Sequence, residues 1–263
     1  MKTSGEEIFI NKPFNIKTIM NQTATMKKLE EMRLHGFSRV YREMMDTGMN
    51  NNFTIDEVIS HLVQAEWDER YNRKLYRLIT QAKFRYQATM EQIDYIEKRN
   101  LDKTIMLRLS SGDWIAKKQN LLITGSTGLG KSYISSALGH QACQQGYKVL
   151  YRNCGKLFDE LKIAKADGSY FKEINKIESQ DLLIIDDFGL KPLDNLHRLI
   201  LLEILEDRHG KRSTLITSQL PVNKWYDIIG EPTIADAILD RLVHSSHRID
   251  LDGDTMRKKY KND

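Results

Sequence analysis

Residues 121–133 read LLITGSTGLGKSY, and this stretch decides the fold. Its apolar start, residues 121–123, predicts a short buried strand, and residues 133–145 behind it predict a helix. The glycines between them, with the Lys-Ser pair that follows, match the pattern G-x-x-x-x-G-K-[ST]. Strand, glycine-rich loop and helix in this order predict an α/β protein whose loop holds an anion. The alternative, a glycine-rich turn followed by a chance Lys-Ser, does not explain that order.

The chemistry expected of this loop is phosphate binding. Glycines let consecutive backbone N–H groups point inward at a phosphate chain, and the helix N-terminus adds partial positive charge at the same place. Lys131 is expected to reach the β- and γ-phosphates of ATP, and the Ser132 hydroxyl to ligate Mg²⁺. The residues predicted to bind the nucleotide are Gly125, Ser126, Thr127, Gly128, Leu129, Gly130, Lys131, Ser132 and Tyr133.

A second motif, DLLIIDD at residues 181–187, predicts a buried strand that ends in two carboxylates. Apolar residues followed by an aspartate form the Walker B pattern, which is a weak signal alone and a strong one after a Walker A loop. Asp186 is expected to hold the Mg²⁺ hydration shell, because Mg²⁺ prefers oxygen ligands and keeps several waters. Asp187 beside it is expected to orient the attacking water.

Further strands and helices alternate after the loop, which predicts a parallel sheet covered on both faces. The expected strands span residues 147–151, 213–218 and 247–251, and the expected helices span 156–165, 196–209 and 234–244. The strand at 213–218 ends in Ser218 and Gln219, and either side chain is a candidate for contact with the γ-phosphate or the catalytic water. Trp114 and Ile115 are candidates for a flap over an adenine ring, or for the core.

The first hundred residues predict a small all-α region. Apolar spacing predicts one amphipathic helix over residues 23–43 and a third, short helix over 89–100. Thr54 and Glu57 predict a capping box, at which a second helix begins. Cations and aromatic residues then interleave over residues 66–86, which is the pattern expected of nucleic-acid binding, although a solvated helix face is the equal alternative. The candidate DNA contacts are Arg70, Arg73, Lys74 and Arg77.

Composition sets broad limits. The chain has 263 residues, a formal net charge of +4 and two cysteines, Cys143 and Cys154. A mildly basic balance permits a polyanion partner without requiring one. The cysteines have no metal-binding spacing and are expected to be reduced thiols, which predicts the cytoplasm. No stretch has the apolar length of a membrane span, and the N-terminus has no signal-peptide core.

Four stretches together resemble the IstB-like AAA+ ATPases, helper proteins of certain bacterial transposons and relatives of the DnaC and DnaI helicase loaders. They are residues 121–133, DLLIIDDFG at 181–189, TLITSQLP at 214–221 and ADAILDRLVHSSHRIDL at 235–251. The sequence AEWDERYNRKLYRLITQAKF at 65–84 is similar to the N-terminal domain of that family. The resemblance covers roughly Thr23 to Lys259.

The resemblance implies an ATPase that oligomerises on double-stranded DNA as a ring or helical filament, bends the DNA and presents it to a transposase for transposition. It implies a sheet order of 5-1-4-3-2, and a role for Arg241 as an arginine finger that acts on a neighbouring subunit. The tail behind residue 251 is too short for the usual AAA+ helical lid, so Arg248 or Arg257 is the candidate for a second sensor arginine. Asp187 stands where many AAA+ proteins carry Glu, so slow hydrolysis is expected.

These expectations give a domain plan and two rival functions. The plan has an extension at residues 1–22, a helical DNA-binding and oligomerisation domain at 23–108, and an AAA+ ATPase domain without a lid at 109–263. Within the class, the alternative is a replicative helicase loader of the DnaC/DnaI type. A small-molecule kinase explains the phosphate loop but not the basic helices or Arg241. A DNA-binding scaffold with a vestigial nucleotide site does not explain why Lys131, Ser132 and Asp186 are all present.

Overall fold

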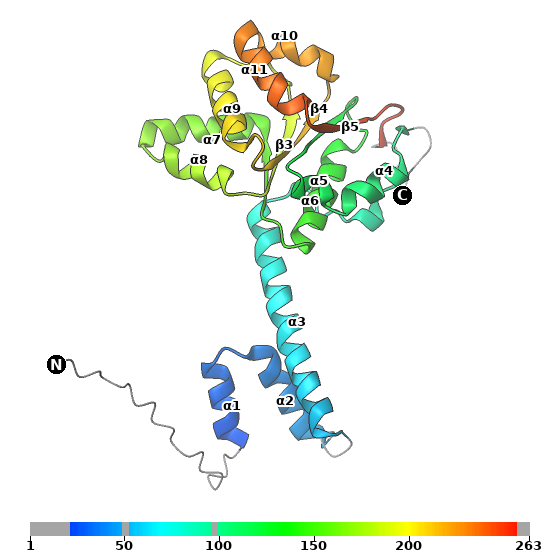
Figure 1. The fold of residues 1–263 in the computed structure, drawn as a ribbon, viewed down its shortest axis with the longest axis vertical. Coiled ribbons are helices and arrows are strands. Elements are labelled where there is room, and N and C mark those ends of the chain that lie inside the picture. The colour runs from blue at the N-terminus through cyan, green and yellow to red at the C-terminus, as the bar shows by residue number, and fades with distance from the viewer. Residues whose placement is uncertain (1–21, 49–52, 96–98, 257–263) are drawn as a thin grey trace, which may run out of the picture. The chain divides into compact units, whose positions relative to one another are not determined.

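The computed structural model describes residues 22–48, 53–95 and 99–256 (Figure 1). The chain divides into two compact units, Met1–Arg73 and Lys74–Asp263. Residues 74–108, which the sequence groups with the helical region, therefore pack in the same unit as the sheet. The assignment of DNA binding and ATP hydrolysis to separate domains stays a prediction.

In the first unit, two helices replace the single helix expected over residues 23–43, so that prediction was wrong. Helix α1 spans Gln22–Glu31 and α2 spans His35–Thr47. The chain turns between them at Arg33, whose φ is 59°, and the Leu34 N–H donates to the Leu29 carbonyl oxygen at 2.9 Å. A left-handed residue closes a helix C-terminus in this way, and apolar periodicity gives no sign of it when the residue is not glycine.

Helix α3 spans Ile55–Ala82 and begins at the predicted capping box. The Thr54 N–H donates to Glu57 Oε2 at 2.8 Å, and the Glu57 N–H donates to Thr54 Oγ1 at 3.3 Å. Both members of the box are therefore in place, and the prediction is confirmed. Further along, the Glu66 carboxylate accepts the Gly36 N–H at 2.9 Å, which ties α2 to α3 within this unit.

The second unit contains a five-stranded parallel sheet. Its strands are β1 (Asn120–Thr124), β2 (Val149–Asn153), β3 (Leu182–Phe188), β4 (Ser213–Ser218) and β5 (Ser246–Asp250). Their spatial order is β2-β3-β4-β1-β5, which confirms the expected order 5-1-4-3-2. The carboxyl ends of all five strands therefore lie along one edge of the sheet.

Alternate residues of the strands feed two separate apolar cores, one on each face. Leu121, Ile123 and Ile184 pack in the core that includes α6 (Lys131–Gln144), whereas Leu122 and Ile185 pack in the other. The first face is also covered by α4 (Lys103–Ser110) and α5 (Asp113–Ala116). The second face carries α7 (Cys154–Asp167), α8 (Tyr170–Glu178), α9 (Asn195–Arg208), α10 (Trp225–Ile229) and α11 (Pro232–Val243) (Figure 1).

The structure decides two expectations for the segment that precedes the sheet. Trp114 and Ile115 are 3% and 2% exposed in the first core, so the core alternative holds and they do not form a flap. The helix expected over residues 89–100 was wrong as well. The 3-10 turn η2 (Met90–Gln92) forms there, irregular backbone follows to residue 95, and residues 96–98 lie outside the described part.

The remaining elements complete the second unit. A 3-10 turn, η4 (Val222–Lys224), leads into α10. Cys143 and Cys154 are both buried, and burial raises the pKa of each thiol to about 12. Within the described ranges, no helix combines the length and the apolar character needed to span a bilayer.

Candidate functional site

The glycine-rich loop lies where β1 ends and α6 begins, at the carboxyl edge of the sheet. Gly125, Gly128 and Gly130 have φ values of 141°, 86° and 86°, which side chains with a Cβ rarely adopt. Lys131 opens the helix, and its Nζ donates to the carbonyl oxygens of Gly125 at 2.6 Å and Ser126 at 2.8 Å. The ammonium group therefore lies over the loop that the sequence assigns to phosphates.

The chain behind β5 returns to cover this loop. The Met256 N–H donates to the Gly128 carbonyl oxygen at 2.9 Å. A Cβ on Gly128 would lie 2.0 Å from Thr255 Oγ1, and a Cβ on Gly125 would lie 2.4 Å from the Leu251 carbonyl oxygen. Glycine is required at both positions for close approach as well as for φ. The segment behind β5, up to Met256, thus packs on the loop.

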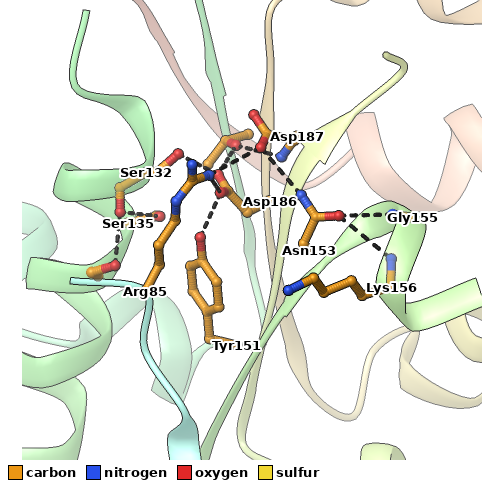
Figure 2. Close-up of polar contacts among 11 residues, drawn as sticks. Arg85, Ser132, Ser135, Tyr151, Asn153, Gly155, Lys156, Asp186 and Asp187 are labelled. Atoms are coloured by element: carbon orange, nitrogen blue, oxygen red, sulfur yellow. Dashed lines mark hydrogen bonds and ion pairs between the residues drawn. The ribbon is translucent and has the colours of Figure 1, made fainter. Parts of the chain in front are cut away.

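The two sequence motifs meet at Asp186, which is fully buried (Figure 2). Ser132 Oγ donates to Asp186 Oδ1 at 2.8 Å, and Thr217 Oγ1 donates to the same oxygen at 2.5 Å. Tyr151 donates its hydroxyl proton to Asp186 Oδ2 at 2.5 Å. Burial and the Asp186 charge raise the pKa of Tyr151, so its hydroxyl stays a neutral donor. Three hydroxyls from three strands or helices therefore hold this carboxylate in one orientation.

Hydrogen bonds to the backbone of Asp187 and to its side chain both hold this residue in place. Its φ is 61°, and its N–H donates to Thr217 Oγ1 at 3.1 Å. The carboxylate accepts Asn153 Nδ2 at 3.2 Å and Arg85 Nη1 at 3.2 Å. Arg85 Nη1 also lies 3.4 Å from Asp186 Oδ2, so one guanidinium bridges both carboxylates (Figure 2). Sequence patterns did not identify Arg85, Tyr151, Asn153 or Thr217 as part of the site.

A cavity of about 440 Å³ opens beside these groups, within the usual range for small-molecule sites. Its polar lining includes the phosphate loop, Ser132 and Asp187. Its apolar lining comes from Tyr86, Ile93, Leu190 and Met256. A lining that combines charged groups with apolar side chains suits a nucleotide, which has a phosphate chain and a base.

Ser218 and Gln219, the two candidates for contact with the γ-phosphate or the catalytic water, have different surroundings. Ser218 is fully buried, its Oγ donates to the Phe188 carbonyl oxygen at 2.8 Å, and the same Oγ accepts the Leu220 N–H at 3.1 Å. Gln219 lines the cavity, and the Thr217 hydroxyl contacts Asp186 and Asp187, whereas the Ser218 hydroxyl contacts only main chain. The catalytic role of each remains a prediction.

Arg241 lies at the opposite edge of the sheet. Its carbonyl oxygen accepts Asn120 Nδ2 at 2.9 Å, and Asn120 is the first residue of β1. At about 3.3 Å per residue, β1 separates that end from the phosphate loop by about 13 Å. The guanidinium pairs with Glu206 and donates to the Ala237 carbonyl oxygen at 2.7 Å. Arg241 therefore cannot serve the site of its own chain in this arrangement.

The other predicted cations lie outside the cavity. Arg248 is exposed on β5, and Arg257 is outside the described residues. On α3, Arg70 pairs with Glu66 at 2.6 Å and Arg73 with Glu69 at 3.3 Å. Lys74 and Arg77 are exposed, and neither has an ion pair within the described part of the chain. Trp67 and Tyr76 on the same helix are 68% and 74% exposed, so these aromatic residues are not core residues.

The site residues fit a magnesium nucleotide. Ser132 and Asp186 offer adjacent oxygen atoms, which Mg²⁺ prefers as ligands or as acceptors for its bound waters. Lys131 and the N-terminus of α6 offer positive charge to phosphates. Mg²⁺ bound there would neutralise charge on the phosphate oxygens.

Known proteins share both the sequence and the fold. A family model described as IstB-like ATP binding protein matches residues 27–263. The insertion sequence ATP-binding protein y4pL of Sinorhizobium fredii (strain NBRC 101917 / NGR234) is 46% identical over 237 residues, which cover 90% of this chain and 97% of that protein. The insertion sequence IS1162 ATP-binding protein of Pseudomonas fluorescens is 41% identical over 198 residues, 75% of this chain and 86% of that protein.

Among solved structures, DnaI superposes with a TM-score of 0.55 at 20% identity, over 67% of this chain and 93% of that chain. The DnaC helicase loader superposes with a TM-score of 0.51 at 16% identity, over 63% of this chain and 97% of that chain. At this identity the likeness concerns the fold, which is the P-loop AAA+ fold. Sequence, fold and the junction of the two motifs agree, and the chain belongs to the IstB-like ATP binding protein family.

Proposed function

We propose that the protein is an ATPase that assembles on double-stranded DNA and activates a partner transposase for DNA transposition. The observation that carries the proposal is the contact between Ser132 and Asp186, at 2.8 Å, in a chain whose relatives are named as insertion sequence ATP-binding proteins. That contact joins the phosphate loop to the carboxylate strand. An intact junction argues against a vestigial nucleotide site.

In the proposed reaction, each part of the site has one task. Lys131 binds the β- and γ-phosphates of ATP, while Ser132 and Asp186 hold Mg²⁺ directly or through water. Asp187 orients the attacking water, and Thr217 fixes the Asp186 carboxylate and the Asp187 backbone through the contacts described above. Gln219 is placed to contact the terminal phosphate or the water from the cavity wall.

The proposed DNA contact is the exposed basic face of α3. Arg70, Arg73, Lys74 and Arg77 lie on this one helix with exposed Trp67 and Tyr76 nearby in the sequence. Phosphate contacts of this kind position a protein on a duplex without reading its sequence. We assign DNA binding and self-assembly to residues 23–108 and ATP hydrolysis to residues 109–263. A ring or helical filament is the assembly that an arginine acting between subunits requires.

A helicase loader is the alternative within the same fold. The likeness to DnaI and DnaC supports the fold alone, because the identities are 20% and 16%. Relatives named for insertion sequences reach 46% identity over 97% of their length. The much closer sequence similarity favours transposition as the process that this protein serves.

Nucleotide binding, ATP hydrolysis and strand transfer, measured on the same variants, test the proposal. Lys131→Ala should abolish binding of a fluorescent ATP analogue, because the phosphates lose their fixed cation. Asp187→Asn should bind the analogue and fail to release phosphate. Both should fail to stimulate strand transfer by the transposase of the same insertion sequence on a DNA target. Wild-type hydrolysis by Asp187→Asn would contradict the role of Asp187, and a wild-type protein without effect on the transposase would contradict the transposition role.

A further inference from the structure

The guanidinium of Arg85 bridges the two carboxylates of the nucleotide site. Arg85 Nη1 lies 3.4 Å from Asp186 Oδ2 and 3.2 Å from Asp187 Oδ2 (Figure 2). Asp186 is fully buried and the Asp187 side chain is 19% exposed, so this pair places two negative charges side by side with little water. A buried carboxylate requires hydrogen bonds and a counter-charge. Arg85 provides that counter-charge.

The other cation of the site faces a different group. Lys131 Nζ donates to the carbonyl oxygens of Gly125 and Ser126, on the loop side of the cavity. Within the described ranges, Arg85 is the residue that forms ion pairs with Asp186 and Asp187. Arg85 therefore supplies positive charge directly to the two carboxylates.

The backbone on both sides of Arg85 is anchored in the second unit. The ring of Phe84 packs against Gly139 of α6 and lies 6.4 Å from the Tyr151 ring. The ring of Tyr86 lies 6.0 Å from that of Tyr133, the residue behind the Lys-Ser pair. These contacts fix the place from which the Arg85 side chain reaches the carboxylates.

The guanidinium itself is held less tightly than its backbone. Its side chain is 45% exposed, and both of its ion-pair distances exceed 3.0 Å. It also lies 5.5 Å from the centroid of the Tyr86 ring, which lines the same cavity. Arg85 can therefore leave the carboxylates toward the cavity without burying its charge in an apolar place.

We propose that Arg85 is a resident counter-ion of the Asp186–Asp187 pair that competes with Mg²⁺ for these carboxylates and so sets the Mg²⁺ concentration at which nucleotide binds. Two causes act together. Arg85 occupies lone pairs that Mg²⁺ or its bound waters need, and its positive charge repels a divalent cation at this distance. The proposal rests on the proposed nucleotide site and adds to it a residue that controls metal binding.

The test is a Mg²⁺ titration of nucleotide binding on the full chain. A fluorescent ATP analogue is held at fixed concentration, and the half-saturating Mg²⁺ concentration is read from the binding signal. Arg85→Gln, which removes the charge and keeps a shorter polar side chain, should lower that midpoint by about three- to tenfold. Arg85→Lys should stay near the wild-type midpoint, because it keeps the charge.

Two further variants control the result. Arg39→Gln removes a half-exposed arginine that pairs with Glu43 at 3.6 Å on α2, and it should leave the midpoint unchanged. In an Asp187→Asn background, Arg85→Gln should shift the midpoint less than in the wild type, because one of the two carboxylates has lost its charge. A midpoint that Arg85→Gln leaves unchanged or raises would overturn the proposal.

The outcomes separate this inference from the proposed function. If the wild-type chain does not bind nucleotide at any Mg²⁺ concentration, the nucleotide site itself is refuted. If the wild type binds with Mg²⁺ and only the Arg85 effect is missing, the inference alone fails. Should Arg85→Gln not fold, arginine side-chain NMR of the wild type decides. The Arg85 Nε–H signal, identified by its loss in Arg85→Lys, should move with the Mg²⁺ midpoint of binding, and a static signal would contradict displacement.

Discussion

The Thr217 hydroxyl touches both catalytic carboxylate residues, whereas that of its neighbour Ser218 touches only main chain. It donates to Asp186 Oδ1 and accepts the Asp187 N–H. Partners of this kind orient metal-binding groups, and their loss costs about 10- to 100-fold in activity or metal affinity. Thr217→Val should therefore lower the ATPase rate by about that factor. The steady-state rate at saturating Mg²⁺ and ATP, compared with nucleotide affinity, checks this expectation.

Ser218→Ala separates the two neighbouring hydroxyls. Ser218 joins the Phe188 carbonyl oxygen to the Leu220 N–H in a fully buried place, so its loss should cost about 1–3 kcal/mol of unfolding free energy. Urea denaturation measures that cost. If Ser218→Ala loses turnover while Thr217→Val keeps it, the hydroxyl that turnover requires is that of Ser218, and the orienting role proposed for Thr217 is wrong.

Sequence patterns identified the site residues that belong to a recognisable motif. They missed the site residues that only the tertiary structure places beside those motifs. Lys131 and Ser132 lie in one motif and Asp186 in another, and a parallel sheet puts both motifs at the same edge. Arg85 and Tyr151 lie outside any phosphate-binding pattern. The one available signal for Thr217 was its place among the polar residues at the end of the strand that spans 213–218.

At the scale of elements, the sequence predicted all five strands. Strands β1 to β4 are buried between two layers of helices, whereas most residues of the edge strand β5 are exposed or half-buried. The helices α4, α5, α8 and α10 were missed, and each of them has fewer than ten residues. The break between α1 and α2 was missed for a different reason. It depends on the left-handed conformation of Arg33. A sequence pattern predicts that conformation for glycine but not for arginine.

The packing of α6 on the segment behind α3 depends on Gly139. A Cβ at this position would lie 2.5 Å from Phe84 Cε1 and 2.8 Å from Ile184 Cδ1. Gly139→Ala should therefore destabilise the fold by about 1–3 kcal/mol through overpacking, despite the better helix propensity of alanine. Urea denaturation followed by far-UV circular dichroism measures the change.

Gly155 provides the matched control on α7. Its nearest contact for an added Cβ is Asn153 Oδ1 at 3.5 Å, which is an ordinary distance. Gly155→Ala should be neutral or stabilise by up to about 1 kcal/mol. Equal destabilisation by both substitutions would show that the Phe84 contact is not the cause.

Helix α3 makes a prediction about DNA. If its cations contact phosphates, an Arg73→Ala and Arg77→Ala double variant should bind DNA more weakly and lower the slope of log K against log salt by about 0.9 for each lost contact. Fluorescence anisotropy over a salt series measures both quantities. An Arg39→Ala and Arg42→Ala variant of α2 is the control. Unchanged DNA affinity and salt slope in the α3 variant would show that these cations form a solvated helix face and do not contact DNA.

At the scale of the whole molecule, the second unit carries two charged cavities at opposite edges of one sheet. The first contains the phosphate loop, and the second, of about 230 Å³, is lined by Lys117, Lys118, Arg208, Arg212 and Arg241 among others. One subunit cannot bring these edges together. Subunits that stack head to tail can, and such a heterologous contact generates a ring or a helical filament.

Arg241 is the residue through which this geometry can be tested. Ile238 and Leu242 are fully buried and anchor α11, so the place of Arg241 on the edge is fixed. Its pair with Glu206 is the alternative role, a half-exposed contact worth about 0–1 kcal/mol. An arginine that reaches a neighbouring phosphate site instead supplies about 10³–10⁵ in rate. Arg241→Ala should therefore abolish DNA-stimulated ATPase activity with little loss of stability.

Mixing two inactive proteins decides between these roles. Arg241→Ala keeps an intact nucleotide site, and Lys131→Ala keeps an intact arginine. In mixed assemblies on DNA, some interfaces pair an intact site with an intact Arg241, so partial ATPase activity should return, with a maximum near equal amounts. An arginine that acted within its own chain would give no recovery at any ratio. Normal hydrolysis by Arg241→Ala alone would show that Arg241 is not an arginine finger. The main structural reason to expect head-to-tail assembly would then be lost.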